Sequence, residues 1–280
     1  MEALFGPHDA ARWIAVPRDD DDKYSRGVVG FVTGSATYPG AAVLGVEAAA
    51  RTGVGMIRYL GAGRPTRLVL QRRPEAVTAD GRVQAWVLGS GHDPESLDEV
   101  TSAMLDGALA QGVPMVLDGG ALGRRAEAQG PVLLTPHAGE LSRLIDLDVD
   151  AIRADPDAAA LRAARELDAT VLLKGHTTRI AVPTATGGAA GRAGPLRVRS
   201  APSWLATAGA GDALAGILGA LLATHHAQLD AEPGLLAPLA ATGAVLHGLA
   251  AERASAGGPL TILDLTAALP AVIAELLRIP

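Results

Sequence analysis

The sequence predicts an α/β fold with a mostly parallel central sheet and helices on both faces. Short segments such as Gly27–Val32 and Ala85–Leu88 are apolar along their whole length, as expected of strands covered on both sides. Longer segments with one apolar face alternate with them, and this alternation is typical of a parallel sheet. The 280 residues contain no internal repeat, so one compact domain is expected.

The first half of the chain opens with an irregular stretch. Residues 1–26 contain the acidic run Asp19–Asp22, so we expect an N-terminal arm in solvent. Proline at position 39 suits a first helical turn. The expected elements are strand Gly27–Val32, loop Thr33–Tyr38, helix Pro39–Thr52, strands Val54–Leu60, Leu68–Gln71 and Ala85–Leu88, helix Pro94–Gln111 with Leu97, Val100, Met104, Ala108 and Leu109 on one face, and strand Val113–Leu117.

The second half continues the alternation and then becomes helical. A Gly- and Ala-rich stretch, Thr184–Gly194, is expected to be a loop. The expected elements are strand Pro131–Leu134, helices Gly139–Ile145 and Pro156–Leu167, strand Thr170–Lys174, an antiparallel return Thr178–Val182, strand Leu196–Arg199, a helix running from Ala206–Asp212 to about Thr224, and helices Leu235–Arg253 and Asp264–Leu277.

The composition excludes several kinds of site and partner. The chain has neither Cys nor Asn, which excludes disulfides, thiol nucleophiles and Cys-ligated zinc. A net charge of −6 leaves no basic stripe for a nucleic acid. The N-terminus lacks a leader pattern, and the apolar run Ala213–Ala223 is shorter than the ~20 residues that span a bilayer. We therefore expect a soluble, cytoplasmic protein without nucleic-acid or membrane partners.

The strongest local signal for chemistry is the small-residue segment Ala206–Gly216. Small residues let a backbone approach a ligand closely, and the amides that begin the following helix favour an anion such as phosphate. Asp212 among those amides could take a proton from a hydroxyl that faces a phosphoryl group. The alternative is an acidic residue that only complements the helix dipole. No Walker-type or GxGxxG motif occurs, so the phosphate site is of another kind.

Three further strand ends carry polar side chains. Lys174 ends one strand. Only Lys23 and Lys174 among the 24 basic residues are lysine, so generic basic positions on the surface are filled by arginine, and a surface role is less expected for Lys174. His137 and Glu140 follow 131–134, and Asp118 follows 113–117. Each could be structural, but ligands bind at the carboxyl ends of parallel strands. Four such loops at one edge predict a site.

Six of the strand-end segments, taken in order, share the pattern of a known family. They are Gly34–Ala42, Val87–Gly91, Val116–Leu122, Leu134–Glu140, Val171–Thr178 and Leu205–Gly216. Together they resemble the ADP/ATP-dependent NAD(P)H-hydrate dehydratases of the ribokinase-like superfamily, from about Asp21 to the C-terminus. The resemblance implies a single ribokinase-like dehydratase domain over residues 27–280, after an arm over residues 1–26.

What the resemblance implies is a repair lyase. Such an enzyme uses ADP or ATP to phosphorylate the hydroxyl of the S-form of hydrated NADH or NADPH, then eliminates phosphate. By the resemblance Asp212 would be the catalytic base, and Glu140 would organise Mg²⁺ through water. The hydrate would contact Ala42, Gly91, His137 and Asp212, and the adenine nucleotide would be held by Lys174, Gly175, His176, Thr177, Thr178, Gly209 and Gly211.

The chain also departs from the family pattern, and two other functions stay open. Gly89–Asp93 stands where the family commonly shows GPGLG, and Ser200–Trp204 stands where a TGNPG-like loop is usual. Leu117–Leu122 stands where the family shows an LDADAL-type segment, with Gly119-Gly120 in place of its second acid. One alternative is a superfamily kinase acting on a hydroxymethyl-pyrimidine or thiazole alcohol. The other is a catalytically silent nucleotide-binding homologue.

The resemblance carries two expectations about partners. It implies a homo-oligomer, a tetramer. It also implies that epimerisation of the hydrate, which a preceding domain often performs in this family, would fall to a separate epimerase. The residues do not decide between ADP and ATP, or between the hydrates of NADH and NADPH.

Overall fold

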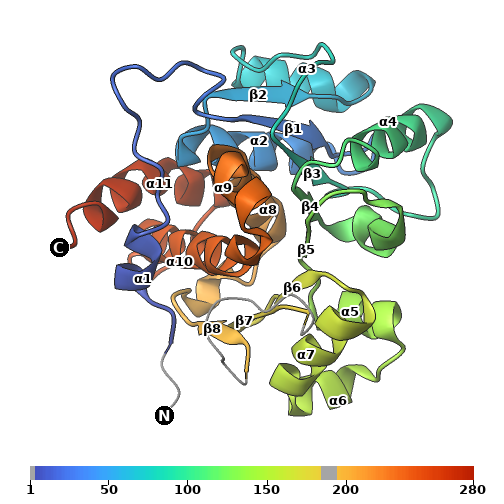
Figure 1. The fold of residues 1–280 in the computed structure, drawn as a ribbon, viewed down its shortest axis with the longest axis vertical. Helices are drawn as coiled ribbons and strands as arrows, with labels where there is room; N and C mark the ends of the chain where they lie inside the picture. The colour runs from blue at the N-terminus through green and yellow to red at the C-terminus, as the bar shows by residue number, and fades with distance from the viewer. Residues whose placement is uncertain (1–3, 184–193) are drawn as a thin grey trace.

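The centre of the computed structural model is an eight-stranded sheet, and the structure describes residues 4–183 and 194–280 (Figure 1). Its strand order is β2-β1-β3-β4-β5-β6-β7-β8. The pairs from β2 to β6 are parallel, whereas β7 pairs antiparallel with both β6 and β8. The strands are β1 Val28–Val32, β2 Met56–Tyr59, β3 Ala85–Leu88, β4 Met115–Leu117, β5 Val132–Leu134, β6 Thr170–Leu173, β7 Thr178–Ala181 and β8 Leu196–Val198.

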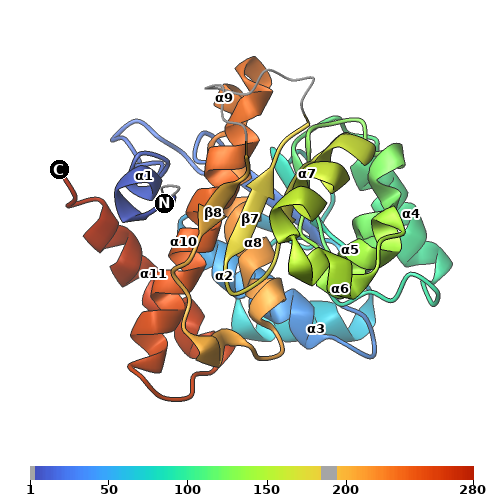
Figure 2. The same ribbon diagram turned by 90° about the horizontal axis from the view of Figure 1, so that it is seen from below.

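Helices lie on both sides of this sheet (Figures 1 and 2). They are α1 Pro7–Ala11, α2 Gly40–Thr52, α3 Gly63–Arg72, α4 Glu99–Leu109, α5 Ala138–Ile145, α6 Val149–Ala154, α7 Pro156–Glu166, α8 Ala210–Thr224, α9 His226–Ala231, α10 Leu236–Ser255 and α11 Ile262–Leu276, with short 3₁₀ helices η1 Gly119–Glu127, η3 Ser203–Leu205 and η4 Pro233–Leu235. The predicted fold class, a mostly parallel α/β sheet covered on both faces, is confirmed.

Alternate residues of each strand divide the core into two clusters. In β1, Val29 and Phe31 belong to the cluster with α2, α8, α10 and α11, while Val28 and Val32 belong to the cluster with α4, α5, α6 and α7. This follows from the two-residue period of a strand. Both faces of the central strands are thus buried, which is why their sequences are apolar throughout.

The position of β1 determines where a crevice opens. The chain goes from β1 to β2 on one side of it and then returns to β3 on the other side. In open parallel sheets, ligands bind outside the carboxyl ends of the strands at such a reversal. The loops after β1 and β3, together with the start of α8, should therefore border the site.

Helices α2 and α8 touch through glycine. A Cβ added at Gly216 of α8 would lie 2.1 Å from the carbonyl oxygen of Gly45 in α2, closer than real atoms approach. Without side chains at this crossing, the two backbones come into direct contact. Ala42 lies one turn before Gly45, and Asp212 lies one turn before Gly216.

Three expectations about local structure are wrong. Leu68–Gln71 lies within helix α3; Pro65 and Val69, one turn apart, are buried whereas Leu70 is exposed, so the apolar run fits a helix. Helix α4 begins at Glu99 because Asp98 caps it by accepting from the Thr101 amide at 2.8 Å, so 94–98 precede it. Its exposed Val100 does not belong to the buried face.

The N-terminal arm is not wholly irregular or solvated. It contains α1, and its Phe5, Trp13 and Ile14 pack against the core cluster that includes α10. The amide of Phe5 also donates to the carbonyl of Arg197 at 2.9 Å. The earlier part of the arm is thus folded against the domain, while Asp19 and Asp20 of the acidic run are exposed. The predicted loop Thr184–Gly194 lies outside the described residues apart from Gly194.

Among the described residues, one helical stretch is long and apolar enough to cross a membrane. Within Pro233–Ser255, the most apolar window of 18 residues has a mean hydropathy of 1.5, and 78% of that window is buried inside the fold. A core helix of a globular domain has this property, because it is covered by its neighbours on several sides.

Candidate active site

Side chains from four separate loops meet at the carboxyl edge of the sheet. Ser90 follows β3, Asp118 follows β4, Thr135 follows β5 and Lys174 follows β6. Asp212 reaches the same place from the first turn of α8. Parallel strands bring their carboxyl ends to one edge, so residues far apart in the sequence become neighbours here.

Lys174 is held in a network of carboxylates. Its Nζ lies 2.8 Å from Oδ1 of Asp118 and 3.5 Å from Oε2 of Glu140. Burial opposes the charge on Lys174, but the charges of Asp118 and Glu140 outweigh burial and raise the pKa of the ammonium. Thr135 donates to the same oxygen of Asp118 at 2.8 Å. Burial likewise opposes ionisation of Asp118, yet the charge of Lys174 and hydrogen bonds from the hydroxyls of Thr135 and Ser90 lower its pKa.

Ser90 connects this network to Asp212. Its Oγ lies 2.6 Å from Oδ1 of Asp212 and 3.1 Å from Oδ2 of Asp118. Burial raises the pKa of Asp212, and the negative charge of Asp118 adds to the effect, while the hydrogen bond from Ser90 partly opposes it. A carboxylate with a raised pKa is a stronger base, as a group that removes a hydroxyl proton must be.

The start of α8 supplies amides beside Asp212. Gly209 is the N-cap, in the left-handed region at φ 89°, where glycine is favoured. Ala210, Gly211 and Asp212 follow as the first turn, whose amides have no partner inside the helix. These donors can stabilise the negative charge of a phosphoryl group next to the base.

His137 and Glu140 form the cap of α5. The Nδ1 of His137 accepts from the amide of Gly139 at 3.0 Å, while Oε2 of Glu140 accepts from the amide of His137 at 2.7 Å. The hydrogen bonds found for this carboxylate among the described residues go to Oε2. The other oxygen therefore remains available for water.

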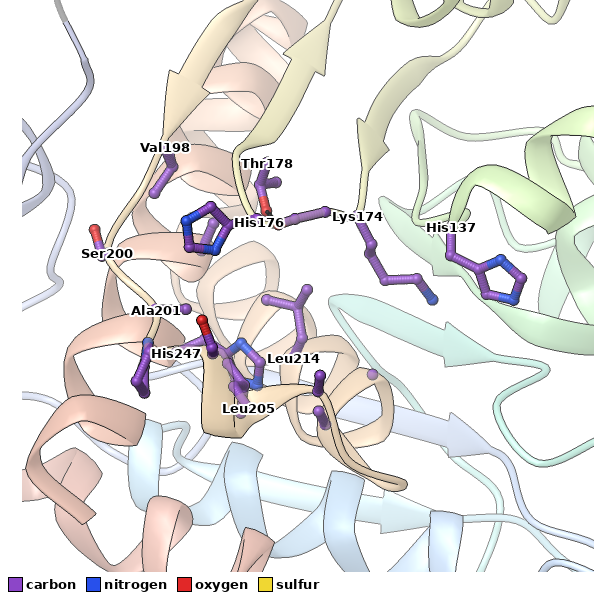
Figure 3. Close-up of a pocket in the computed structure, with 17 residues that line it drawn as sticks. His137, Lys174, His176, Thr178, Val198, Ser200, Ala201, Leu205, Leu214 and His247 are labelled. Atoms are coloured by element: carbon purple, nitrogen blue, oxygen red, sulfur yellow. Dashed lines mark hydrogen bonds between the residues drawn. The ribbon is translucent and has the colours of Figure 1, made fainter. Parts of the chain in front are cut away.

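A cavity of about 550 Å³ adjoins these residues (Figure 3). Its labelled side chains come from the β6–β7 turn, from β8 and the segment after it, and from α8, α10 and the start of α5. Of the residues predicted to hold the nucleotide, five line it: Lys174, Gly175, His176, Thr178 and Gly211. Thr177 and Gly209 do not line it, although both adjoin residues that do.

The residues predicted to contact the substrate fall in two places. His137 lines the cavity beside Lys174. Ala42 is fully buried near the start of α2, and Gly91 lies against that helix, since a Cβ added at Gly91 would be 2.5 Å from Cβ of Ala41. Ser90, the neighbour of Gly91, contacts Asp212, so Ala42 and Gly91 lie in the part of the site next to this carboxylate.

Comparisons with known proteins show the family of the chain. The sequence profile of the NAD(P)H-hydrate dehydratase family matches residues 29–269. The chain belongs to this family. The ADP-dependent (S)-NAD(P)H-hydrate dehydratase of Neisseria meningitidis serogroup B is 35% identical over 263 residues, which cover 85% of this chain and 81% of that protein. The predicted resemblance is therefore confirmed.

Two further members of the dehydratase family are similar to this chain, one in sequence and one in structure. The bifunctional NAD(P)H-hydrate repair enzyme Nnr of Mycobacterium tuberculosis (H37Rv) is 43% identical over 229 residues, 77% of this chain and 44% of that protein. The chain spans about half the length of such bifunctional relatives. A crystal structure of the ADP/ATP-dependent NAD(P)H-hydrate dehydratase of Bacillus subtilis, co-crystallised with ATP and Mg²⁺, matches with a TM-score of 0.82 and 26% identity over 98% of each chain.

Two residues of this dehydratase-family site were not predicted from the sequence. Ser90 drew notice only as a departure from the family pattern, because a lone serine in a glycine loop has no spacing that indicates a partner. His247 lies in the apolar helix α10 and lines the cavity. Its Nε2 is buried without a hydrogen-bond partner among the described residues. The sequence signal that could have indicated His247 as a site residue is a histidine within an otherwise apolar helical segment.

Proposed function

We propose that this protein dehydrates the S-form of hydrated NADH or NADPH, using ADP or ATP as the phosphoryl donor. The observation that carries the proposal is the place of Asp212, in the first turn of α8 and in contact with Ser90, beside a cavity of nucleotide size. Relatives that align along most of this chain are named as ADP-dependent dehydratases of this hydrate.

The nucleotide binds in the 550 Å³ cavity in this proposal. Lys174, Gly175, His176 and Thr178 line it, and Gly211 at the start of α8 adjoins Lys174, since a Cβ there would be 3.5 Å from Nζ of Lys174. A terminal phosphate beside them would meet one ammonium and the first-turn amides of Gly211 and Asp212. The hydrate lies by Asp212, near Ala42 and Gly91, and reaches His137 at the border of the same cavity.

The reaction then has two balanced steps. Asp212 removes the proton of the substrate hydroxyl while that oxygen bonds to the terminal phosphorus, and the bond from this phosphorus to the rest of the nucleotide breaks. In the second step the carbon–oxygen bond of the phosphorylated hydrate breaks and phosphate leaves. The neighbouring ring carbon gives its proton to the departing phosphate, and the electron pair of that C–H bond forms the ring double bond of the dihydronicotinamide.

Mg²⁺ fits this site as a companion of the nucleotide. Among the described residues no group of three or more His, Asp or Glu side chains could hold a metal ion by itself. Magnesium commonly keeps several waters and is bound through few carboxylates together with substrate phosphates. Glu140, with one oxygen outside the hydrogen bonds of the α5 cap, would hold it through water. When bound, the ion neutralises charge on the phosphates.

The proposal includes a setting for the protein. We place it in the cytoplasm as a homo-oligomer, a tetramer, that receives the S-form from a separate epimerase. The Mycobacterium tuberculosis relative is named bifunctional, and 77% of the present chain matches 44% of its length. Size-exclusion chromatography with light scattering tests the assembly independently of activity.

One experiment decides the activity. The protein is incubated with chemically hydrated NADH or NADPH, Mg²⁺ and either ADP or ATP, and the dihydronicotinamide absorbance and released phosphate are followed together. We expect both to rise in equal amounts with at least one nucleotide. Absence of any absorbance recovery with either nucleotide refutes the proposal, and nucleotide consumption with a pyrimidine or thiazole alcohol would indicate a kinase.

A further inference from the structure

Ser90 stands between two carboxylates with a single proton to donate. Its Oγ is 2.6 Å from Oδ1 of Asp212 and 3.1 Å from Oδ2 of Asp118, and the residue is 2% exposed. A serine hydroxyl carries one O–H donor, so it can serve one acceptor at a time. The shorter distance indicates that the proton points to Asp212.

The backbone around Ser90 holds this hydroxyl in place. Gly89 and Gly91 on either side lie in the left-handed region, at φ 91° and 72°. A Cβ at Gly89 would be 2.3 Å from the carbonyl oxygen of Asp118, so the loop after β3 lies directly against the loop after β4. The carbonyl of Ser90 accepts from the amide of Gly34 at 2.7 Å. The position of Oγ is therefore fixed by contacts to two neighbouring loops.

We propose that Ser90 is a positioning residue for Asp212, whose hydroxyl fixes Oδ1 of that carboxylate and leaves Oδ2 for the substrate hydroxyl. This inference rests on the proposed function. Among the described residues, no hydrogen bond to Oδ2 of Asp212 is found. The hydroxyl also stands between the two carboxylates, which would otherwise face one another directly.

The same geometry offers a second role, transfer of a proton through Ser90 to Asp118, and the surrounding charges argue against it. Lys174 and Thr135 each lie 2.8 Å from Oδ1 of Asp118 and stabilise its ionised form, and Glu140 faces Lys174 from α5. Asp212 is largely buried, and none of the described residues places a cation in hydrogen-bond contact with it. A proton taken from the substrate therefore stays on Asp212, and Ser90 orients the base without carrying its proton.

The test is Ser90→Ala, which removes the hydroxyl and keeps the Cβ. We expect kcat to fall by about ten- to a hundredfold, the range typical of a hydrogen bond to a charged group, with nucleotide Kd unchanged. Loss of a donor to the ionised form raises the pKa of Asp212, so the acid limb of the kcat profile should move to higher pH. Ser90→Thr, which keeps the hydroxyl, should restore both values.

A second measurement does not depend on turnover. In protein labelled with carbon-13 aspartate, the carboxyl signal of Asp212, assigned by its loss in Asp212→Asn, should titrate at higher pH in Ser90→Ala than in the parent. Ser255→Ala, which removes another buried serine hydroxyl, at the end of α10, should leave that midpoint unchanged. An unchanged Asp212 midpoint in Ser90→Ala overturns the inference, as does parent-like kcat with a parent-like acid limb. An inactive parent protein refutes the proposed function alone, because the carbon-13 titration still decides the role of Ser90.

Discussion

The ammonium of Lys174 lies 2.8 Å from Oδ1 of Asp118, in a pair whose side chains are 20% and 8% exposed. Lys174 therefore neutralises a buried carboxylate and also lines the cavity that we propose for the nucleotide. We expect Lys174→Ala to weaken nucleotide binding more than hydrate binding and to cost about 3–5 kcal/mol of unfolding free energy, because Asp118 is left unpaired. Calorimetry and denaturant unfolding measure the two effects.

A double variant separates these tasks of Lys174. Adding Asp118→Asn to Lys174→Ala removes the unpaired charge, so most of the lost stability should return while nucleotide affinity stays low. If nucleotide affinity returned together with stability, Lys174 would be a structural cation only. Equal nucleotide affinity in Lys174→Ala and the parent would exclude its binding role directly.

Replacement of Asp212 with Asn should abolish turnover without unfolding the protein. Asn keeps the shape but cannot accept a proton, and general-base assistance is worth ~10²–10⁴-fold, so kcat should fall at least ~10²-fold. Because burial raises the pKa of Asp212, its charge is a cost to the fold, and the melting temperature should hold or rise. An active but less stable Asp212→Asn protein would show that Asp212 only complements the helix dipole.

The acid side of the activity profile should report Asp212. Burial and the charge of Asp118 raise its pKa above the ordinary 3.8, and only the ionised form can accept the substrate proton. Activity should therefore be full well above this pKa and fall as the pH drops through it. Measurement of kcat/KM across the acidic range gives the midpoint, and a value at or below 3.8 would contradict the assignment.

His247 should contribute to nucleotide affinity through a neutral imidazole. Burial lowers its pKa to about 4, so at neutral pH the ring can accept a hydrogen bond at the buried Nε2. We expect His247→Phe to raise the nucleotide Kd about tenfold, the effect of about 1.4 kcal/mol, because an acceptor for an amino or hydroxyl group of the ligand is lost. His226→Phe, outside the cavity, serves as the control. Equal nucleotide Kd values in both variants would exclude a role of His247 in nucleotide binding.

Glu47 should determine much of the acid stability. Its side chain is fully buried in α2, and although burial opposes ionisation, hydrogen bonds from Arg73, Arg51 and Arg72 lower its pKa to about 2. This lowered value stabilises the fold above the unfolded pKa of 4.5, and the contribution is lost as the pH falls from there toward 2. Unfolding measured against pH should show this loss in the parent and not in Glu47→Gln.

A matched variant controls for charge removal at Glu47. Glu47→Gln should cost roughly 3 kcal/mol at neutral pH, because three guanidinium groups lose a buried partner. Glu166 forms the same i,i+4 type of pair with Arg162 at 2.6 Å, but both side chains are substantially exposed. Glu166→Gln should cost less than ~1 kcal/mol. Similar costs for the two variants would mean that burial does not distinguish the pairs.

The sequence predicted most of the sheet because buried parallel strands have an unmistakable composition. Segments such as Ala85–Leu88 are apolar on both faces, and the structure places them in the centre of the sheet. Leu68–Gln71 has a similar composition in a short window, but Pro65 and Val69 lie on one helical face. Propensity over four residues cannot separate these cases, since the burial of a single face is a tertiary property.

The sequence predicted the site residues that belong to a recognisable motif. It did not predict those that only the folded structure brings to the site. Asp212 and Lys174 stood in distinctive segments, and the structure brings both to the same edge. The contact between Ser90 and Asp212 joins residues 122 positions apart, and no local pattern reports it. The burial of His247 likewise depends on how α10 packs against α8 and β8, which a single sequence does not specify.

The glycine contact between α2 and α8 makes the catalytic geometry vulnerable to remote mutation. A methyl group at Gly216 would collide with the backbone of Gly45 and wedge the helices apart, and Asp212 is carried on the same helix one turn away. A displacement of the order of 1 Å at a reacting group can cost ~10²-fold in rate. In a library screened for growth under hydrate stress, Gly216 should therefore tolerate as little variation as Asp212, although it touches no ligand.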